Sequence, residues 1–276
     1  MCWSIIETET GRGLQDLACP WPQGMDSARP GVMRTLVVTP TYNERDNLGA
    51  LAEAVLASPV QADYLIVDDN SPDGTGGLAD EIAAREPRFH VHHRPGKLGL
   101  GSAYREAFHW AVEQGYDAVI SMDGDWSHHP RYLPALVEGT QRADLVIGSR
   151  YLNGISVVNW ELSRLILSTI ANTYARTITH LPFRDCTSGF QCLTRRALQR
   201  IGLDQIRTNG YSFLIELKYR VIKAGLSGIE VPIVFTDRQA GASKISKAEI
   251  ARSMVTPWKM RLGFWERGEG FGRDAG

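Results

Sequence analysis

The chain has 276 residues, enough for one α/β domain with appendages but too few for a second large domain. Its 30 lysine and arginine residues nearly balance its 31 aspartate and glutamate residues, so no overall positive charge indicates a nucleic-acid partner. Four cysteines without zinc-type spacing predict neither a disulfide framework nor a zinc site; they favour a reducing, cytoplasmic compartment, with Cys186 and Cys192 in packing roles.

Both ends of the chain are expected to lie outside the folded domain. Residues 1–33 are rich in glycine, proline and charge and lack the apolar segment of a signal peptide, so they are predicted to be a disordered extension. Met33 stands just before the first predicted strand, and a mis-assigned start codon is a competing explanation for this segment. The domain is predicted to span 34–265, with a flexible tail over 266–276. No apolar run approaches the roughly 20 residues needed to span a bilayer, so the chain is not expected to cross one.

Apolar strands alternate with amphipathic helices in the first half of the chain. The predicted strands are 35–39, 63–68, 89–93, 118–122 and 144–149, with helices around 48–56, 75–85 and 102–114. Because the strands are apolar nearly throughout, the pattern indicates an α/β fold with a mostly parallel sheet covered by helices on both faces.

The pattern changes beyond Tyr151. Two helices are predicted at 160–180 and 211–224, followed by a strand at 229–236. An amphipathic helix with basic residues is predicted from Lys247 to about Trp265. No internal repeat is visible.

Asp123 and Asp125 follow the apolar run 118–122, and Pro130 can open a helix shortly afterwards. Their spacing of two places both carboxylates on the same side of an extended chain. Two carboxylates at the carboxyl end of a parallel strand form a hard oxygen site for a divalent cation, with room for a ligand's phosphates. Asp-Gly-Asp alone is equally an ordinary turn.

Polar clusters also end the first two strands. Pro40, Tyr42, Asn43 and Glu44 could hold a base and ribose, or could form only a proline turn that starts a helix. Asp68 and Asp69 lie on opposite sides of a strand end, so one of them should face the ligand. Asp73 is as well explained as a helix cap.

The glycine-rich stretch 96–101 matches neither a Walker loop nor a Gly-x-Gly-x-x-Gly fingerprint, and we interpret it as a flexible turn beside Lys97. His128 and His129 are expected to be loop or cap residues rather than metal ligands. Four basic residues on separate elements could be surface charge or anion contacts, and Arg238 is the strongest candidate because it lies in a glycine-containing polar loop: Arg150, Arg164, Arg238 and Lys244.

Seven ordered motifs resemble the family 2 glycosyltransferases of the GT-A fold, and among them the dolichyl- or polyprenyl-phosphate mannose synthases. The resemblance covers about residues 34–262. The motifs are Val38-Thr-Pro-Thr-Tyr-Asn-Glu44, Val67-Asp-Asp-Asn-Ser-Pro-Asp-Gly-Thr75, Lys97-Leu-Gly-Leu-Gly-Ser-Ala103, Met122-Asp-Gly-Asp-Trp-Ser-His-His-Pro130, Gly148-Ser-Arg150, Thr187-Ser-Gly-Phe190 and Arg238-x-x-Gly-x-Ser-Lys244.

The resemblance implies transfer of mannose from GDP-mannose to a polyprenyl phosphate, with Mg²⁺ or Mn²⁺, at the cytoplasmic face of a membrane and with a possible membrane-protein partner. It implies catalytic roles for Asp125, Arg150 and Arg238, and metal binding by Asp123 and Asp125. Nucleotide contacts are implied for Pro40, Tyr42, Glu44, Val67, Asp68 and Asp69. Acceptor-phosphate contacts are implied for Arg150, Arg164, Arg238 and Lys244. Ser127 stands where some relatives carry glutamine as a further metal ligand.

A phosphate acceptor agrees with this set of residues. A phosphate monoester has a second pKa near 6, so its nucleophilic oxygen is already mostly ionised at pH 7 and no catalytic base is required. A single displacement would invert the anomeric carbon and give a β-linked product. Three alternatives remain: a UDP-glucose-dependent enzyme of the same fold, a non-catalytic nucleotide-binding subunit of a membrane complex, and a peripheral membrane adaptor that uses only the helices at 159–180 and 247–265.

Overall fold

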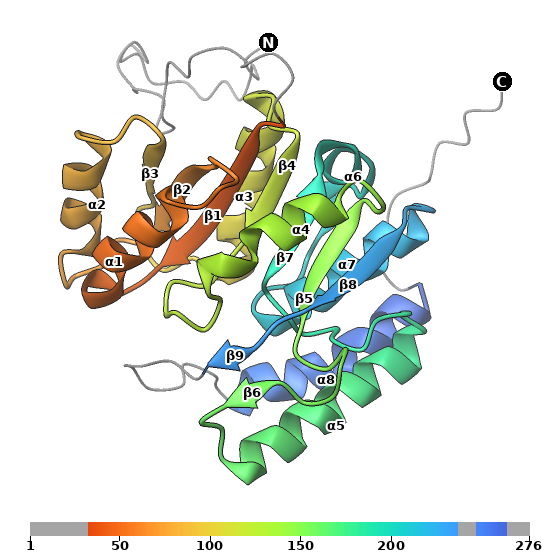
Figure 1. Cartoon of the computed structure of the whole chain (residues 1–276). Helices are drawn as coiled ribbons and strands as arrows, with labels where there is room; N and C mark the ends of the chain where they lie inside the picture. Colours follow the sequence, from red (N-terminus) through yellow and green to blue (C-terminus); the bar gives the residue numbers. More distant parts are fainter. Residues whose placement is uncertain (1–32, 237–246, 264–276) are drawn as a thin grey trace, which may run out of the picture.

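The computed structural model describes residues 33–236 and 247–263 (Figure 1). The expected amino-terminal extension, apart from Met33, and the carboxyl-terminal tail lie outside the described residues, as do Arg238, Lys244 and Trp265.

The described residues form a central sheet of seven strands in the order β3-β2-β1-β4-β7-β5-β8. The strand bounds are β1 Thr35–Thr41, β2 Asp63–Asp68, β3 Phe89–His93, β4 Ala118–Ser121, β5 Leu145–Ser149, β7 Gln191–Thr194 and β8 Gly228–Pro232. Strand β7 is antiparallel to its neighbours β4 and β5, and the other pairs in this sheet are parallel. The prediction of a mostly parallel sheet is therefore confirmed.

Helices cover both faces of this sheet (Figure 1). Helices α1 (Arg45–Leu56), α2 (Thr75–Ala83) and α4 (Leu133–Gly139) pack on one face, and α3 (Leu100–Glu113), α6 (Arg195–Arg200) and α7 (Tyr211–Lys223) pack on the other. The period of two separates the side chains of a single strand: Leu36 and Val38 face the α3 side, whereas Val37 faces the α1 side. Two apolar layers are thus buried against one sheet.

Two further helices lie side by side at the lower edge of the view (Figure 1). They are α5 (Leu162–Thr179) and α8 (Lys247–Arg261), and the Tyr174 hydroxyl on α5 donates to the Met254 carbonyl on α8 at 2.6 Å. A small parallel sheet of β6 (Val157–Val158) and β9 (Phe235–Thr236) lies beside them. The predicted amphipathic helices are therefore present and pack on each other.

Several predicted boundaries were wrong. The single strand at 229–236 is two strands, because β8 ends at Pro232, which has no N–H for the ladder, and the chain pairs again only at β9. The short elements β7, α4 and α6 were not predicted. Helix α8 ends at Arg261 and contains Pro257.

Candidate functional site

The carboxyl ends of β1, β2 and β4 lie at one edge of the sheet, because these strands are parallel neighbours. Asp123 and Asp125 follow the end of β4 directly. The Asp125 Oδ1 atom accepts the Ser127 N–H at 3.1 Å, and Trp126 between them has a φ of 64°. This tight turn leaves the Asp123 side chain 41% exposed and Asp125 half-buried. The aspartates therefore stand at the solvent edge, as the sequence predicted.

His128 packs beneath the surface against this aspartate turn and bonds to its backbone. Its Nδ1 atom accepts the Asp123 N–H at 3.0 Å, and its ring stacks on Phe190 with centroids 4.9 Å apart. Burial lowers the pKa of His128, although the Asp123 charge acts in the opposite direction. The lowered pKa favours a neutral ring whose Nδ1 is an acceptor. His129 Nδ1 instead accepts the Arg131 N–H, where it caps the short helix that Pro130 opens. The predicted loop and cap roles of both histidines are confirmed.

The aspartate pair fits a hard divalent cation. Mg²⁺ is commonly held by one or two carboxylates together with substrate phosphates and water, and both aspartates here are partly exposed at this edge. Within the described residues, no three or more His, Cys, Asp and Glu side chains are grouped to hold a metal ion. A bound nucleotide and water could supply further ligands to a cation held by the two aspartates.

Asp68, at the end of β2, mainly organises the neighbouring loop. It is 2% exposed, and its carboxylate accepts the Thr41 hydroxyl at 3.0 Å and the Ser71 N–H at 3.0 Å. Asp69 forms an ion pair with Arg94, with Oδ1 and Nη1 2.6 Å apart. Both carboxylates are thus buried and engaged, Asp68 by Thr41 and Ser71 and Asp69 by Arg94.

Arg94 was missed by the sequence analysis. It follows β3 at the same sheet edge, is 3% exposed, and also donates to the Ser102 hydroxyl at 2.6 Å. Its Nε lies 3.2 Å from a Glu106 carboxylate oxygen. Its position directly after a predicted strand was the available signal. Through Arg94, the start of α3 is tied to Asp69.

The loop after β1 supplies the other predicted nucleotide contacts. Lys97 places its Nζ 4.3 Å from the centre of the Tyr42 ring, which brings the glycine-rich stretch against this loop. The Glu44 N–H donates to the Thr75 hydroxyl at 3.0 Å. Pro40 lies in β1 opposite Val67, whose fully buried side chain packs in the core rather than at the edge. Pro40, Tyr42 and Glu44 thus share the edge with Asp69, and their nucleotide contacts remain predictions.

A cluster of aromatic rings and arginines lies on the other side of the aspartate turn. The Arg150 and Arg164 guanidinium carbons lie 5.7 and 4.5 Å from the centre of the Trp160 ring. Phe235 contacts Trp160 edge to face at 5.5 Å and His128 at 5.6 Å. The structure thus brings Arg150 and Arg164 together, as predicted, and connects them to Asp123 through Phe235 and His128.

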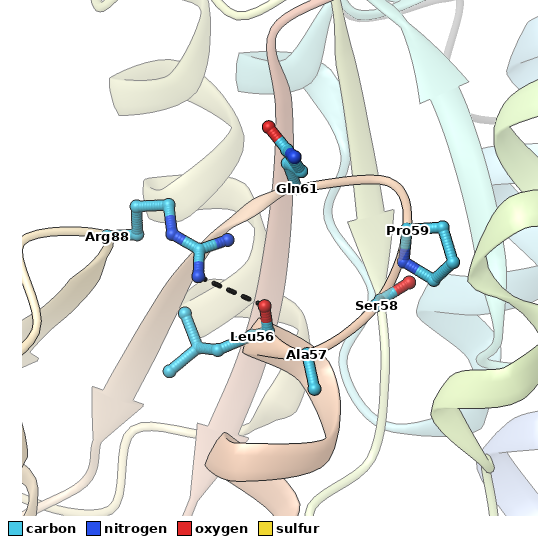
Figure 2. Close-up of a pocket in the computed structure, with 6 residues that line it drawn as sticks. All are labelled: Leu56, Ala57, Ser58, Pro59, Gln61 and Arg88. Atoms are coloured by element: carbon cyan, nitrogen blue, oxygen red, sulfur yellow. Dashed lines mark hydrogen bonds between the residues drawn. The ribbon is translucent and has the colours of Figure 1, made fainter.

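A separate hollow lies at the amino end of β2, away from this edge (Figure 2). It is lined by Leu56, Ala57, Ser58, Pro59, Gln61 and Arg88, and Arg88 Nη2 donates to the Leu56 carbonyl at 3.0 Å. This bond caps the carboxyl end of α1. The hollow contains none of the predicted site residues.

The fold is that of the GT-A class of glycosyltransferases. It resembles the crystal structure of glucosyl-3-phosphoglycerate synthase from Mycobacterium tuberculosis in complex with Mn²⁺, uridine diphosphate and glucosyl-3-phosphoglycerate, with a TM-score of 0.60. The sequences are 19% identical, and the match covers 86% of this chain and 87% of that one. At that identity the likeness defines the fold alone.

Residues 36–202 match the model of Glycosyl transferase family 2. The polyprenol monophosphomannose synthase of Mycolicibacterium smegmatis is 45% identical over 239 residues, covering 85% of this chain and 90% of the relative. The undecaprenyl-phosphate mannosyltransferase of Micrococcus luteus is 43% identical over 232 residues, covering 82% and 94%. The chain belongs to glycosyltransferase family 2, which confirms the family resemblance of its motifs.

Proposed function

We propose that this protein transfers mannose from GDP-mannose to a polyprenyl phosphate and releases GDP and a polyprenyl-phosphate β-mannose, a reaction of the dolichyl-phosphate β-D-mannosyltransferase type. One structural observation carries the proposal: Asp123, in the turn after β4, is linked through His128 and Phe235 to Arg150, and the Trp160 ring beside Phe235 contacts Arg164. An acidic site for a metal and diphosphate thus adjoins a basic site for a second anion. The names of two relatives above 40% identity support mannose and a polyprenyl phosphate.

The acidic site and the basic site would have different roles in the reaction. Asp123 and Asp125 would hold Mg²⁺ or Mn²⁺ against the diphosphate. The bound cation would neutralise negative charge on the departing GDP. Pro40, Tyr42, Glu44 and Asp69 would hold the guanosine part, with Asp69 fixed by Arg94.

Arg150 and Arg164 would bring the acceptor phosphate beside the sugar, together with Arg238 and Lys244, which lie outside the described residues. Arginine suits this task because its planar fork recognises phosphate oxygens. The acceptor oxygen is already ionised at pH 7, so the side chains need only orient two anions for in-line attack. Inversion of the anomeric carbon follows from that single displacement.

An exposed apolar face supports contact with a lipid surface, where a polyprenyl phosphate would reside. Eight large apolar side chains, each at least 50% exposed, lie on α5 or on α8 and its end: Leu162, Ile166, Leu167, Ile170, Met254, Val255, Trp258 and Leu262. Arg164, Arg176, Lys259 and Arg261 belong to the same two helices. Basic residues around an apolar helical face favour anionic membrane surfaces. No helix in the described part of the chain is long and apolar enough to cross a bilayer.

We place this contact at the cytoplasmic face of the membrane, where a membrane-protein partner could share the α5–α8 surface. The free, buried Cys186 and Cys192 are compatible with a reducing compartment.

The proposal is tested with the purified protein, Mg²⁺, polyprenyl phosphate in detergent, and radiolabelled GDP-mannose or UDP-glucose. We expect label from GDP-mannose alone to enter the organic phase, and Asp125→Ala to prevent it. Label from UDP-glucose alone would contradict the donor assignment. GDP binding without transfer from either donor would instead indicate a nucleotide-binding subunit.

A further inference from the structure

Arg150 forms an ion pair with a buried carboxylate that has no role in the function proposed above. Asp185, in the loop between α5 and β7, is fully buried. Its Oδ2 atom accepts the Arg150 Nε–H at 2.7 Å and the Arg150 backbone N–H at 3.0 Å, and its Oδ1 atom accepts from Nη2 at 2.7 Å. This is a two-point pair between a carboxylate and the fork of the guanidinium.

Thr187 completes the attachment of Arg150. Its hydroxyl accepts a second bond from Nη2 at 2.8 Å, and its N–H donates to the Asn172 side-chain oxygen on α5 at 3.2 Å. Asp185 and Thr187 together therefore accept three N–H bonds from the Arg150 guanidinium. Three aromatic rings, those of Tyr151, Trp160 and Phe235, lie 5.4 to 5.7 Å from its central carbon.

Asp185 is itself held firmly. Its N–H donates to Glu230 Oε1 on β8 at 2.9 Å. Burial alone would raise the pKa of Asp185, but the Arg150 guanidinium brings it below its ordinary value, so the carboxylate is ionised at neutral pH. A buried charge pair of this kind is costly to desolvate and is weak evidence for a gain in stability. A role in orienting Arg150 explains it better.

We propose that Asp185 is a positioning residue: it fixes the Arg150 guanidinium, before the acceptor arrives, in the orientation that binds the acceptor phosphate. This rests on the proposed function, because Arg150 is assigned to the acceptor phosphate there. An arginine side chain loses rotamer entropy when it is held in one orientation, and a pair that restricts it in advance removes part of that cost from binding. Without Asp185, Arg150 would carry a less compensated charge but would lose its orientation, and we expect the second effect to dominate.

The test measures the affinity for a short-chain polyprenyl phosphate, such as citronellyl phosphate, by calorimetry in the absence of donor. Asp185→Asn should weaken this binding at least about fivefold and leave the affinity for GDP within about twofold. Glu230→Gln is the matched control, because it contacts the Asp185 backbone but not Arg150, and it should alter neither affinity. Thr187→Val, which removes one acceptor of Nη2, should weaken phosphate binding by a smaller factor and serves if Asp185→Asn does not fold.

A double-mutant cycle with Arg150→Met separates positioning from a general structural defect. If Asp185 acts through Arg150, then Asp185→Asn, or Thr187→Val in its place, should weaken phosphate binding little further in the Arg150→Met background. Unchanged or tighter phosphate binding by the single variants, additive losses in the cycle, or no phosphate binding by the wild-type protein would overturn the proposal. A wild-type protein that binds the phosphate but transfers no mannose would defeat the proposed function and still decide the role of Asp185.

Discussion

Lys218 on α7 gives a prediction about stability and pH. It is fully buried, and its Nζ donates to the Ser188 carbonyl at 2.8 Å and to the Leu214 carbonyl at 3.3 Å. Burial lowers its pKa to about 8, against the opposing effect of Asp185. The ordinary value, which the unfolded chain should show, is 10.5.

The direction of the change in stability with pH follows from the number of protons bound in the folded and unfolded states. Between pH 8 and pH 10.5 the unfolded chain keeps a proton on Lys218 that the folded protein has released, so stability rises with pH in this window. Below pH 8 both states are protonated and the folded state bears the cost of the buried charge. Integrating the two titrations from pH 7 to pH 9.5 gives a gain of about 2 kcal/mol from this one residue.

Lys218→Met removes this titration while keeping an unbranched side chain. Urea unfolding at pH 7 and pH 9.5 gives, for each protein, the change in the free energy of unfolding between the two pH values. Subtracting the change of the variant from that of the wild-type protein largely cancels the contributions of the other ionisable groups. We expect the wild-type protein to gain about 2 kcal/mol relative to the variant. Changes that agree within about 0.5 kcal/mol would refute the reasoning that burial depresses the pKa of Lys218.

Four further predictions concern the metal, the fold and the nucleotide edge. Chelation with EDTA should abolish mannose transfer and Mg²⁺ or Mn²⁺ should restore it, whereas activity that survives chelation would contradict a metal-dependent site. Asp125→Ala should lower kcat at least about a thousandfold, roughly 4 kcal/mol in the barrier, with an unchanged circular dichroism spectrum; a near wild-type rate would remove Asp125 from the mechanism. Gly139→Ala should lower the free energy of unfolding in urea by about 1–3 kcal/mol. A Cβ there would lie 2.7 Å from a Val146 methyl carbon, which outweighs the roughly 1 kcal/mol that alanine gains in a helix, and unchanged stability would show that the packing adjusts. Arg94→Met should weaken GDP binding about tenfold in calorimetry, because Asp69 loses a cation 2.6 Å away; unaltered affinity would show that the Arg94–Asp69 ion pair does not organise the nucleotide site.

Local sequence signals were sufficient to predict the strands in the first half of the chain. Strands β2 and β3 have the predicted bounds, and β1, β4 and β5 differ from theirs by one or two residues. These strands are apolar runs followed by turn-forming residues, so both their type and their ends are visible in the sequence. The edge position of Asp123 and Asp125 followed from the same pattern.

The antiparallel strand β7 could not be predicted in this way. It has four residues, and it is inserted between β4 and β5, from which it is distant in the sequence. Its pairing depends on tertiary contacts such as the Ser121 hydroxyl donating to the Gly189 carbonyl at 2.7 Å. A run this short carries too little periodicity to be identified alone.

The partners of the charged candidate residues could not be predicted from the sequence either. Arg94 and Asp185 are separated from Asp69 and Arg150 by 25 and 35 positions, and no spacing rule links such pairs. The sequence therefore indicated candidate residues for the site, whereas only the structure shows which partners hold them in place. The same limit applied to Asp68, whose carboxylate accepts the Thr41 hydroxyl from the end of β1 as well as the Ser71 N–H.

We propose direct transfer of mannose from GDP-mannose to a polyprenyl phosphate with inversion. The most direct measurement is NMR of the lipid product made by the purified protein from GDP-mannose and a short polyprenyl phosphate, with GDP release quantified in the same reaction. We expect a β-mannosyl phosphate and one GDP released for each lipid product. An α-linked product, or GDP and free mannose without a lipid product, would contradict it.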